Sequence, residues 1–145
     1  MPEVDLDVSR ETIEKLSAFA ALVDKWTSKI NLISKQDRSD IWQRHIIDSA
    51  QLYSLGLGQG NWVDLGSGGG FPAIVLAILD QDRENRFRFT LVESDIRKAV
   101  FLRTAIRELG LSAEVVSDRI EKIPSLHASV LSARALADLD TLLGF

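Results

Sequence analysis

The residues best suited to bind a ligand form a glycine-rich stretch, residues 64–72, with the sequence DLGSGGGFP. It follows a short apolar segment, 61–65, typical of a buried β-strand, and leads into an apolar segment, 73–79, that predicts a helix. Glycines at such a turn let the backbone approach a ligand closely and adopt positive φ without a Cβ clash. The stretch therefore predicts a site for a nucleotide-like ligand at the carboxyl edge of a parallel sheet.

The spacing of these glycines distinguishes between nucleotide classes. The dinucleotide fingerprint is G-x-G-x-x-G, and Gly66 and Gly68 supply its first two glycines, but Phe71 occupies its last position. A phenyl ring there opposes the close packing of helix on strand that the third glycine permits. The pattern present is G-x-G-x-G, ending at Gly70, and no P-loop motif occurs. A nicotinamide-binding Rossmann module is disfavoured but stays an alternative, as does a non-catalytic nucleotide-binding module.

Two charged residues follow later predicted strands and extend the candidate site. Glu93 ends the segment 87–93, and a carboxylate there can accept two hydrogen bonds from a ribose diol. A merely solvated or capping acid is the alternative. Arg134 follows the segment 128–132, and we expect it to contact the cofactor, the target phosphate or the base. Its alternative is a surface arginine without a ligand.

Helical segments with regular apolar spacing surround these motifs. The segment 10–30 has apolar residues at intervals of three and four, with Ser9 placed as an N-cap. A second helix is expected over 41–55, and a short one over 138–143. A further helix is expected over 95–109, with Ser94 as its cap. Five residues of that helix form one apolar stripe: Ile96, Ala99, Leu102, Ile106 and Leu109.

The order of the elements indicates the fold class. Predicted strands at 61–65, 87–93, 113–116 and 128–132 alternate with helices, which favours right-handed βαβ units and a parallel sheet. We expect a Rossmann-like α/β core over 59–145, preceded by an N-terminal helical segment over 1–58 that packs on it as part of a single domain. Four strands make an incomplete sheet, so we expect a truncated chain with an exposed edge. The oligomeric state stays open, with self-association over that edge as one outcome.

Composition excludes several kinds of site. The chain has 145 residues, 46% of them hydrophobic, and a formal net charge of −4. It has no cysteine, which excludes thiolate metal sites and cysteine nucleophiles. Its two histidines are far apart in sequence, so no metal site is expected. Neither a secretory signal nor an apolar run long enough to span a membrane is present, which predicts a cytoplasmic protein with no membrane partner.

These motifs together resemble a class I S-adenosyl-L-methionine-dependent methyltransferase, which has G-x-G-x-G after the first strand and an acid ending the second. The detailed sequence of these motifs is similar to that of one family, the small-subunit ribosomal RNA guanine-N7 methyltransferases, also called RsmG or glucose-inhibited division protein B. The matching pieces, in order along nearly the whole chain, are Lys25-Trp26 with Asn31-Leu32, 44–49 (RHIIDS), 63–72, Lys98 with Phe101-Leu102, 119–121 (RIE) and 133–135 (ARA).

The resemblance implies a cofactor, a partner and site residues. The cofactor would be S-adenosyl-L-methionine, and the partner 16S ribosomal RNA of the small ribosomal subunit. Five residues match the family's cofactor contacts: Gly66, Phe71, Ile120, Glu121 and Arg134. The chain departs from the family at Ala73, where glycine is usual, and the family's members continue beyond the sheet strands present here.

The residues also bear on the class of methyl transfer. Methylation of pyrimidine C5 uses a cysteine nucleophile, which is absent. Guanine N7 carries a free lone pair and no proton, so its methylation needs proximity and in-line orientation rather than a general base. No catalytic residue is assigned, which is consistent with N7 chemistry. Seven basic residues are candidates for RNA phosphate contact, two or three of which we expect to touch RNA: Arg83, Arg86, Arg88, Arg97, Lys98, Arg103 and Arg107.

Overall fold

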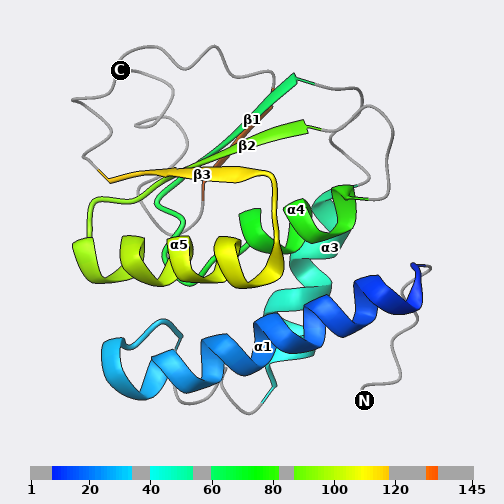
Figure 1. The fold of residues 1–145 in the computed structure, drawn as a ribbon, viewed down its shortest axis with the longest axis horizontal. Coiled ribbons are helices and arrows are strands. Elements are labelled where there is room, and N and C mark those ends of the chain that lie inside the picture. The colour runs from blue at the N-terminus through cyan, green and yellow to red at the C-terminus, as the bar shows by residue number, and fades with distance from the viewer. Residues whose placement is uncertain (1–7, 34–39, 54–59, 82–86, 118–129, 134–145) are drawn as a thin grey trace.

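The fold was obtained as a computed structural model, which describes residues 8–33, 40–53, 60–81, 87–117 and 130–133. Strands and helices alternate from β1 to β3, as the sequence predicts, after an N-terminal part whose described elements are all helical (Figure 1). The elements are α1 (Arg10–Ile30), η1 (Trp42–Ile47), α3 (Asp48–Tyr53), β1 (Gly60–Leu65), α4 (Ala73–Asp80), β2 (Phe87–Val92), α5 (Ile96–Leu109), β3 (Ala113–Val116) and β4 (Val130–Ala133).

The four strands form one parallel sheet in the order β3-β2-β1-β4. The first strand, β1, therefore lies inside the sheet. The strands β2 and β3 follow on one side of it, and β4 lies on the other side. That order places the carboxyl ends of β1 and β2 side by side, with Leu65 opposite Val92. The prediction of a Rossmann-like α/β fold with a parallel sheet is confirmed. The fourth strand lies at 130–133 rather than at the predicted 128–132.

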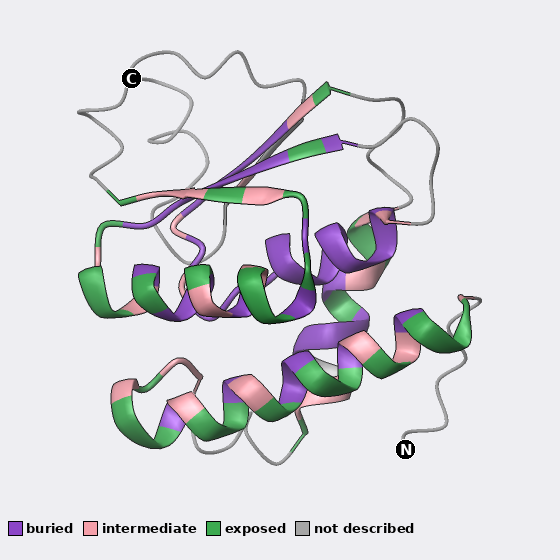
Figure 2. Cartoon of the chain, in the orientation of Figure 1, coloured by how far each residue is buried: buried purple, intermediate pink, exposed green. Residues whose placement is uncertain are grey.

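Helices and the sheet share a single apolar core. Figure 1 shows α4 and α5 along one side of the sheet, with α1 beyond them, and α1 contacts both helices. Every residue of α4 is buried, and α1 adds Leu16, Phe19 and Val23 to the same core (Figure 2). The N-terminal helix thus supports the layer that carries the glycine-rich turn. The division into segments 1–58 and 59–145 stays a prediction.

Helix boundaries follow from their capping residues, with one correction. Ser9 caps α1 as predicted, because its side chain accepts a hydrogen bond from the Thr12 N–H at 3.2 Å. The prediction of Ser94 as the cap of α5 is wrong. Asp95 has extended backbone angles there and accepts from the N–H groups of Arg97 and Lys98. The following helix therefore begins one residue later than predicted, at Ile96.

Two further helix predictions hold in part. The segment predicted as a helix over 41–55 is helical as far as Tyr53, with the π-helical η1 before the short α3, and residues 54–55 lie outside the described residues. On α5, the apolar stripe holds for Ala99, Leu102 and Leu109, which are all buried, but Ile96 is 74% exposed. Ile96 stands in the first turn, just past the end of β2, where no described element covers it. The predicted helix over 138–143 lies outside the described residues.

Candidate cofactor site

The glycine-rich turn, residues 66–72, is tied to the end of the neighbouring strand. The backbone N–H groups of Gly66 and Ser67 both donate to the carbonyl of Val92, at 2.8 and 3.2 Å, and Gly70 N–H donates to Ser67 O at 2.7 Å. These bonds continue the β1–β2 pairing beyond the last residues of the strands. The turn is therefore held against the carboxyl end of β2, at the sheet edge where ligands bind in such folds.

Glu93 fastens this turn to the beginning of α5. Its Oε1 accepts a hydrogen bond from Gly68 N–H at 2.7 Å, and its Oε2 accepts from Asp95 N–H at 2.9 Å. The side chain is only 7% exposed. Each carboxylate oxygen can accept a second hydrogen bond. The predicted bond to a ribose diol, which stays a prediction, is therefore compatible with the role of Glu93 in holding the turn.

The glycines of the turn face two different environments. A Cβ at Gly68, whose φ is +51°, would meet only one atom within 4 Å, the Gly66 carbonyl oxygen at 3.8 Å. A Cβ at Gly70, whose φ is +91°, would lie 2.8 Å from both Ile74 Cγ1 and Phe19 Cζ. Gly68 therefore leaves space on the open side of the turn. Gly70 lets the other side pack closely against the protein.

Phe71 anchors the turn to the N-terminal helices. Its ring is 5% exposed and packs between Phe19 of α1 and His45 of η1, with ring centroids 5.3 and 4.8 Å away. Because the ring is enclosed by protein, any contact of Phe71 with a cofactor would come from its backbone. Neither aromatic partner could be predicted from the sequence pattern, since both are distant from Phe71 in the chain.

A polar chain below the turn joins β1 to β4. The indole N–H of Trp62 donates to Ser132 Oγ at 3.1 Å, and that hydroxyl donates to Asp64 Oδ1 at 2.8 Å. Asp64 is 1% exposed and begins the glycine-rich stretch. This contact was not predicted from the sequence. A charged residue inside an apolar strand was a usable signal for it, because buried charges require partners.

The structure brings four of the predicted site residues together and leaves the rest untested. Gly66, Gly68, Phe71 and Glu93 all lie in or against the turn. The other three, Ile120, Glu121 and Arg134, lie outside the described residues.

Neither a cluster of metal-ligating side chains nor a helix able to cross a membrane is present among the described residues. In that part of the chain, no three histidine, aspartate or glutamate side chains gather as metal ligands would. No helix within the same ranges is long and apolar enough to cross a membrane.

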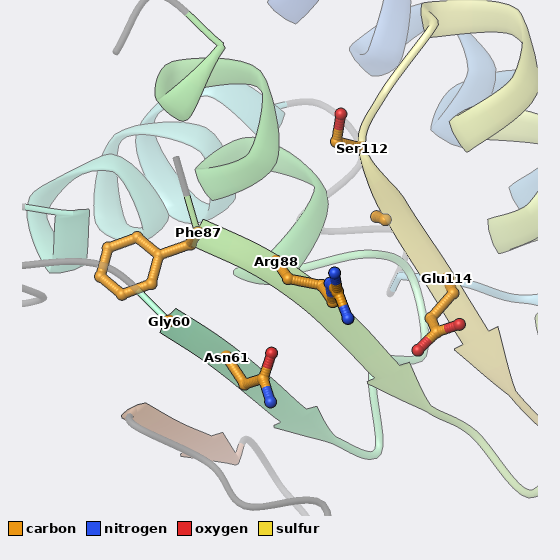
Figure 3. A pocket seen from close by; sticks show the side chains of 7 residues that line it. Gly60, Asn61, Phe87, Arg88, Ser112 and Glu114 are labelled. Carbon is orange, nitrogen blue, oxygen red and sulfur yellow. The ribbon is translucent and has the colours of Figure 1, made fainter. Parts of the chain in front are cut away.

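An open groove of ≈ 660 Å³ lies at the opposite edge of the sheet. Figure 3 shows Gly60 and Phe87 at the beginnings of their strands, with Asn61, Arg88 and Glu114 close by. In parallel α/β sheets, ligands bind at the carboxyl ends of the strands. The groove is therefore not the site that the glycine-rich turn forms.

Comparison with known proteins agrees with this geometry. The profile of the GidB family, described as rRNA small subunit methyltransferase G, matches residues 12–145. The chain belongs to this family. It is 53% identical to the ribosomal RNA small subunit methyltransferase G of Ruegeria sp. (strain TM1040), covering 98% of this chain and 69% of that protein. It is 58% identical to the protein of the same name from Cereibacter sphaeroides (strain ATCC 17029), covering 94% of this chain and 67% of the relative.

A solved structure supports the fold of this GidB-family chain. The O-methyltransferase from Bacillus cereus, crystallised in complex with SAH, superimposes with a TM-score of 0.53 at 18% identity, over 92% of this chain and 57% of that one. At this identity the likeness concerns the fold alone, which is that of a methyltransferase with a parallel α/β core. The chain spans about two thirds of the length of its two GidB-family relatives.

Proposed function

We propose that this chain is an S-adenosyl-L-methionine-dependent methyltransferase that acts on N7 of a guanine in 16S ribosomal RNA of the small subunit. Membership of the GidB family supports the reaction and the class of substrate. The observation that carries the proposal is the hydrogen bond from Gly68 N–H to Glu93, which fixes a glycine turn and an acid at one sheet edge. Both features belong to a nucleotide-like cofactor site.

The residues of this chain would bind and orient the cofactor. When bound, S-adenosyl-L-methionine supplies a methyl group on a positively charged sulfur. Glu93 would accept hydrogen bonds from the ribose with the lone pairs that Gly68 and Asp95 leave free. The open side of Gly68 gives the cofactor room to approach the backbone. Arg134 would contact the cofactor or the RNA.

The lack of an assigned base is compatible with attack by guanine N7. That nitrogen uses its own lone pair, and no proton has to leave before the methyl group is transferred. The protein then contributes mainly proximity and in-line orientation, which can lower a barrier by about 7–11 kcal/mol. A rigid turn serves this purpose better than a mobile one. The bonds of the turn to Val92 and Glu93 supply that rigidity.

The nicotinamide alternative loses support from the position of Phe71. A dinucleotide fingerprint requires glycine there for close packing of helix on strand. In this chain a phenyl ring is present and is enclosed between Phe19 and His45. We therefore retain methyl transfer as the function.

The experiment is transfer of labelled methyl groups from S-adenosyl-L-methionine to small-subunit ribosomal RNA that lacks the modification. The RNA is then digested to nucleosides, and the labelled nucleoside is identified by mass spectrometry. We expect 7-methylguanosine. A different methylated nucleoside would overturn the assignment to N7, and absence of transfer by a chain that binds the cofactor would overturn the proposed function.

A further inference from the structure

Helix α5 is basic although the chain as a whole is acidic. Between Ile96 and Leu109 it carries four basic side chains and one acidic side chain, Glu108, whereas the full chain has a net charge of −4. Charge of one sign concentrated on one element of an oppositely charged protein indicates a partner of complementary charge. A polyanion is therefore the partner that this helix fits.

Most of the exposed residues of α5 lie along one stripe. Ile96, Val100, Arg103 and Arg107 follow each other at intervals of four, three and four residues, which places them on one side of an α-helix. All four are exposed, Ile96 at 74% and Val100 at 46%. Arg97 forms one edge of this stripe, with its side chain 70% exposed, and Glu108 is exposed next to Arg107. Figure 2 shows exposed segments along α5 on the side turned to the viewer.

The stripe begins beside the candidate cofactor site. The first residue of α5, Ile96, follows Asp95, whose N–H group donates to Glu93. Glu93 in turn holds Gly68. In Figure 1, the chain passes from β2 into α5 at the left of the view, and α5 runs from there between β3 and α1. A long substrate lying on this helix would therefore reach the sheet edge where the cofactor is expected.

The arginines of the stripe retain donors for a ligand. Arg97 Nε lies 4.0 Å from Asp95 Oδ1. Because the arginine is exposed, this ion pair contributes little to stability. Arg103 uses Nη2 for a 3.4 Å hydrogen bond to the Val115 carbonyl. A guanidinium group has five N–H donors, so most of them stay available. Guanidinium geometry matches phosphate oxygens in a bidentate manner.

We propose that the α5 stripe, formed by Ile96, Arg97, Val100, Arg103 and Arg107, is a docking surface for the substrate RNA. This inference rests on the proposed function. The arginines bind backbone phosphates, and the two aliphatic side chains contact an unstacked base or a sugar next to the cofactor site. Single-stranded and looped RNA presents such bases to apolar surfaces. Three arginines around only two aliphatic residues favour RNA over a protein partner.

The two kinds of residue predict two separable defects in RNA binding. Each phosphate contact contributes about 0.7 to 0.9 to the slope of log K against log salt. Replacing Arg97 and Arg107 together by glutamine should therefore lower that slope by about 1.4 to 1.8. Replacing Ile96 and Val100 together by serine should weaken binding about tenfold through lost apolar contact and leave the slope unchanged.

The test measures binding of a fluorescent fragment of small-subunit ribosomal RNA by anisotropy at several salt concentrations. The matched control is Arg10→Gln, which removes an exposed helical arginine from α1, and we expect it to bind RNA as the unaltered chain does. Calorimetric titration with S-adenosyl-L-methionine accompanies each variant. Unchanged affinity for the cofactor shows that the site is intact.

Distinct results refute the two proposals. If the unaltered chain methylates RNA and the double arginine variant keeps its slope, the docking surface is wrong and the proposed function stands. If the unaltered chain neither binds nor methylates RNA, both fail. Binding of the stripe to anionic lipid vesicles in preference to RNA, lost in the Ile96→Ser/Val100→Ser variant, would also overturn the docking of RNA.

Discussion

Substitution of Gly70 by alanine tests the close packing of the glycine-rich turn. The added Cβ would lie 2.8 Å from both Ile74 Cγ1 and Phe19 Cζ, and the residue has a φ of +91°. A side chain at positive φ costs about 1–2 kcal/mol. Overpacking of a filled core costs a further 1–3 kcal/mol or so. We therefore expect the variant to lose about 2–5 kcal/mol of unfolding free energy.

Gly110→Ala is the matched control for this variant. Gly110 also has a positive φ, +65°, but a Cβ there would meet no atom within 4 Å. It should cost only the backbone term, about 1–2 kcal/mol, and leave cofactor binding unchanged. Urea unfolding followed by circular dichroism measures both losses, and calorimetric titration with S-adenosyl-L-methionine measures binding. Equal destabilisation of the two variants would refute the packing argument, because only Gly70→Ala places its Cβ against core atoms.

Two further variants test the hydrogen bonds of the site. Glu93→Gln replaces one of the two carboxylate oxygens, which accept hydrogen bonds from Gly68 and Asp95. We therefore expect a loss of about 1.5–3 kcal/mol in unfolding free energy and weaker cofactor binding. An unchanged cofactor affinity in that variant would contradict the role given to the carboxylate. Ser132→Ala removes the hydroxyl between Trp62 and Asp64, and should cost about 1–3 kcal/mol in urea unfolding. A loss within experimental error would show that this polar chain contributes nothing.

The central part of the site could be predicted from sequence because its determinants are local. The glycine spacing from Gly66 to Gly70 and the acid at Glu93 both depend on position relative to a strand, and strands are visible in the apolar pattern. The parallel sheet follows from the alternation of strands and helices. These features require no knowledge of which distant segments touch.

The features that could not be predicted from the sequence depend on contacts between distant segments, or on where a helix begins to within one residue. Ile96 continues an apolar stripe, yet it is exposed because its turn has passed the end of the sheet. Ser94 and Asp95 are both good capping residues, and only the backbone angles decide between them. The packing of Phe71 against Phe19 and His45 joins three separate parts of the chain.

The cofactor assignment is tested most directly by a calorimetric titration of this chain with S-adenosyl-L-methionine, its demethylated product and NAD in parallel. The glycine-rich turn held by Glu93 predicts saturable binding of the first two ligands and none of NAD. Glu93→Gln should lower the affinity for both S-adenosyl-L-methionine and its demethylated product. Binding of NAD alone would contradict the account, because it would assign the turn that contains Phe71 to a dinucleotide.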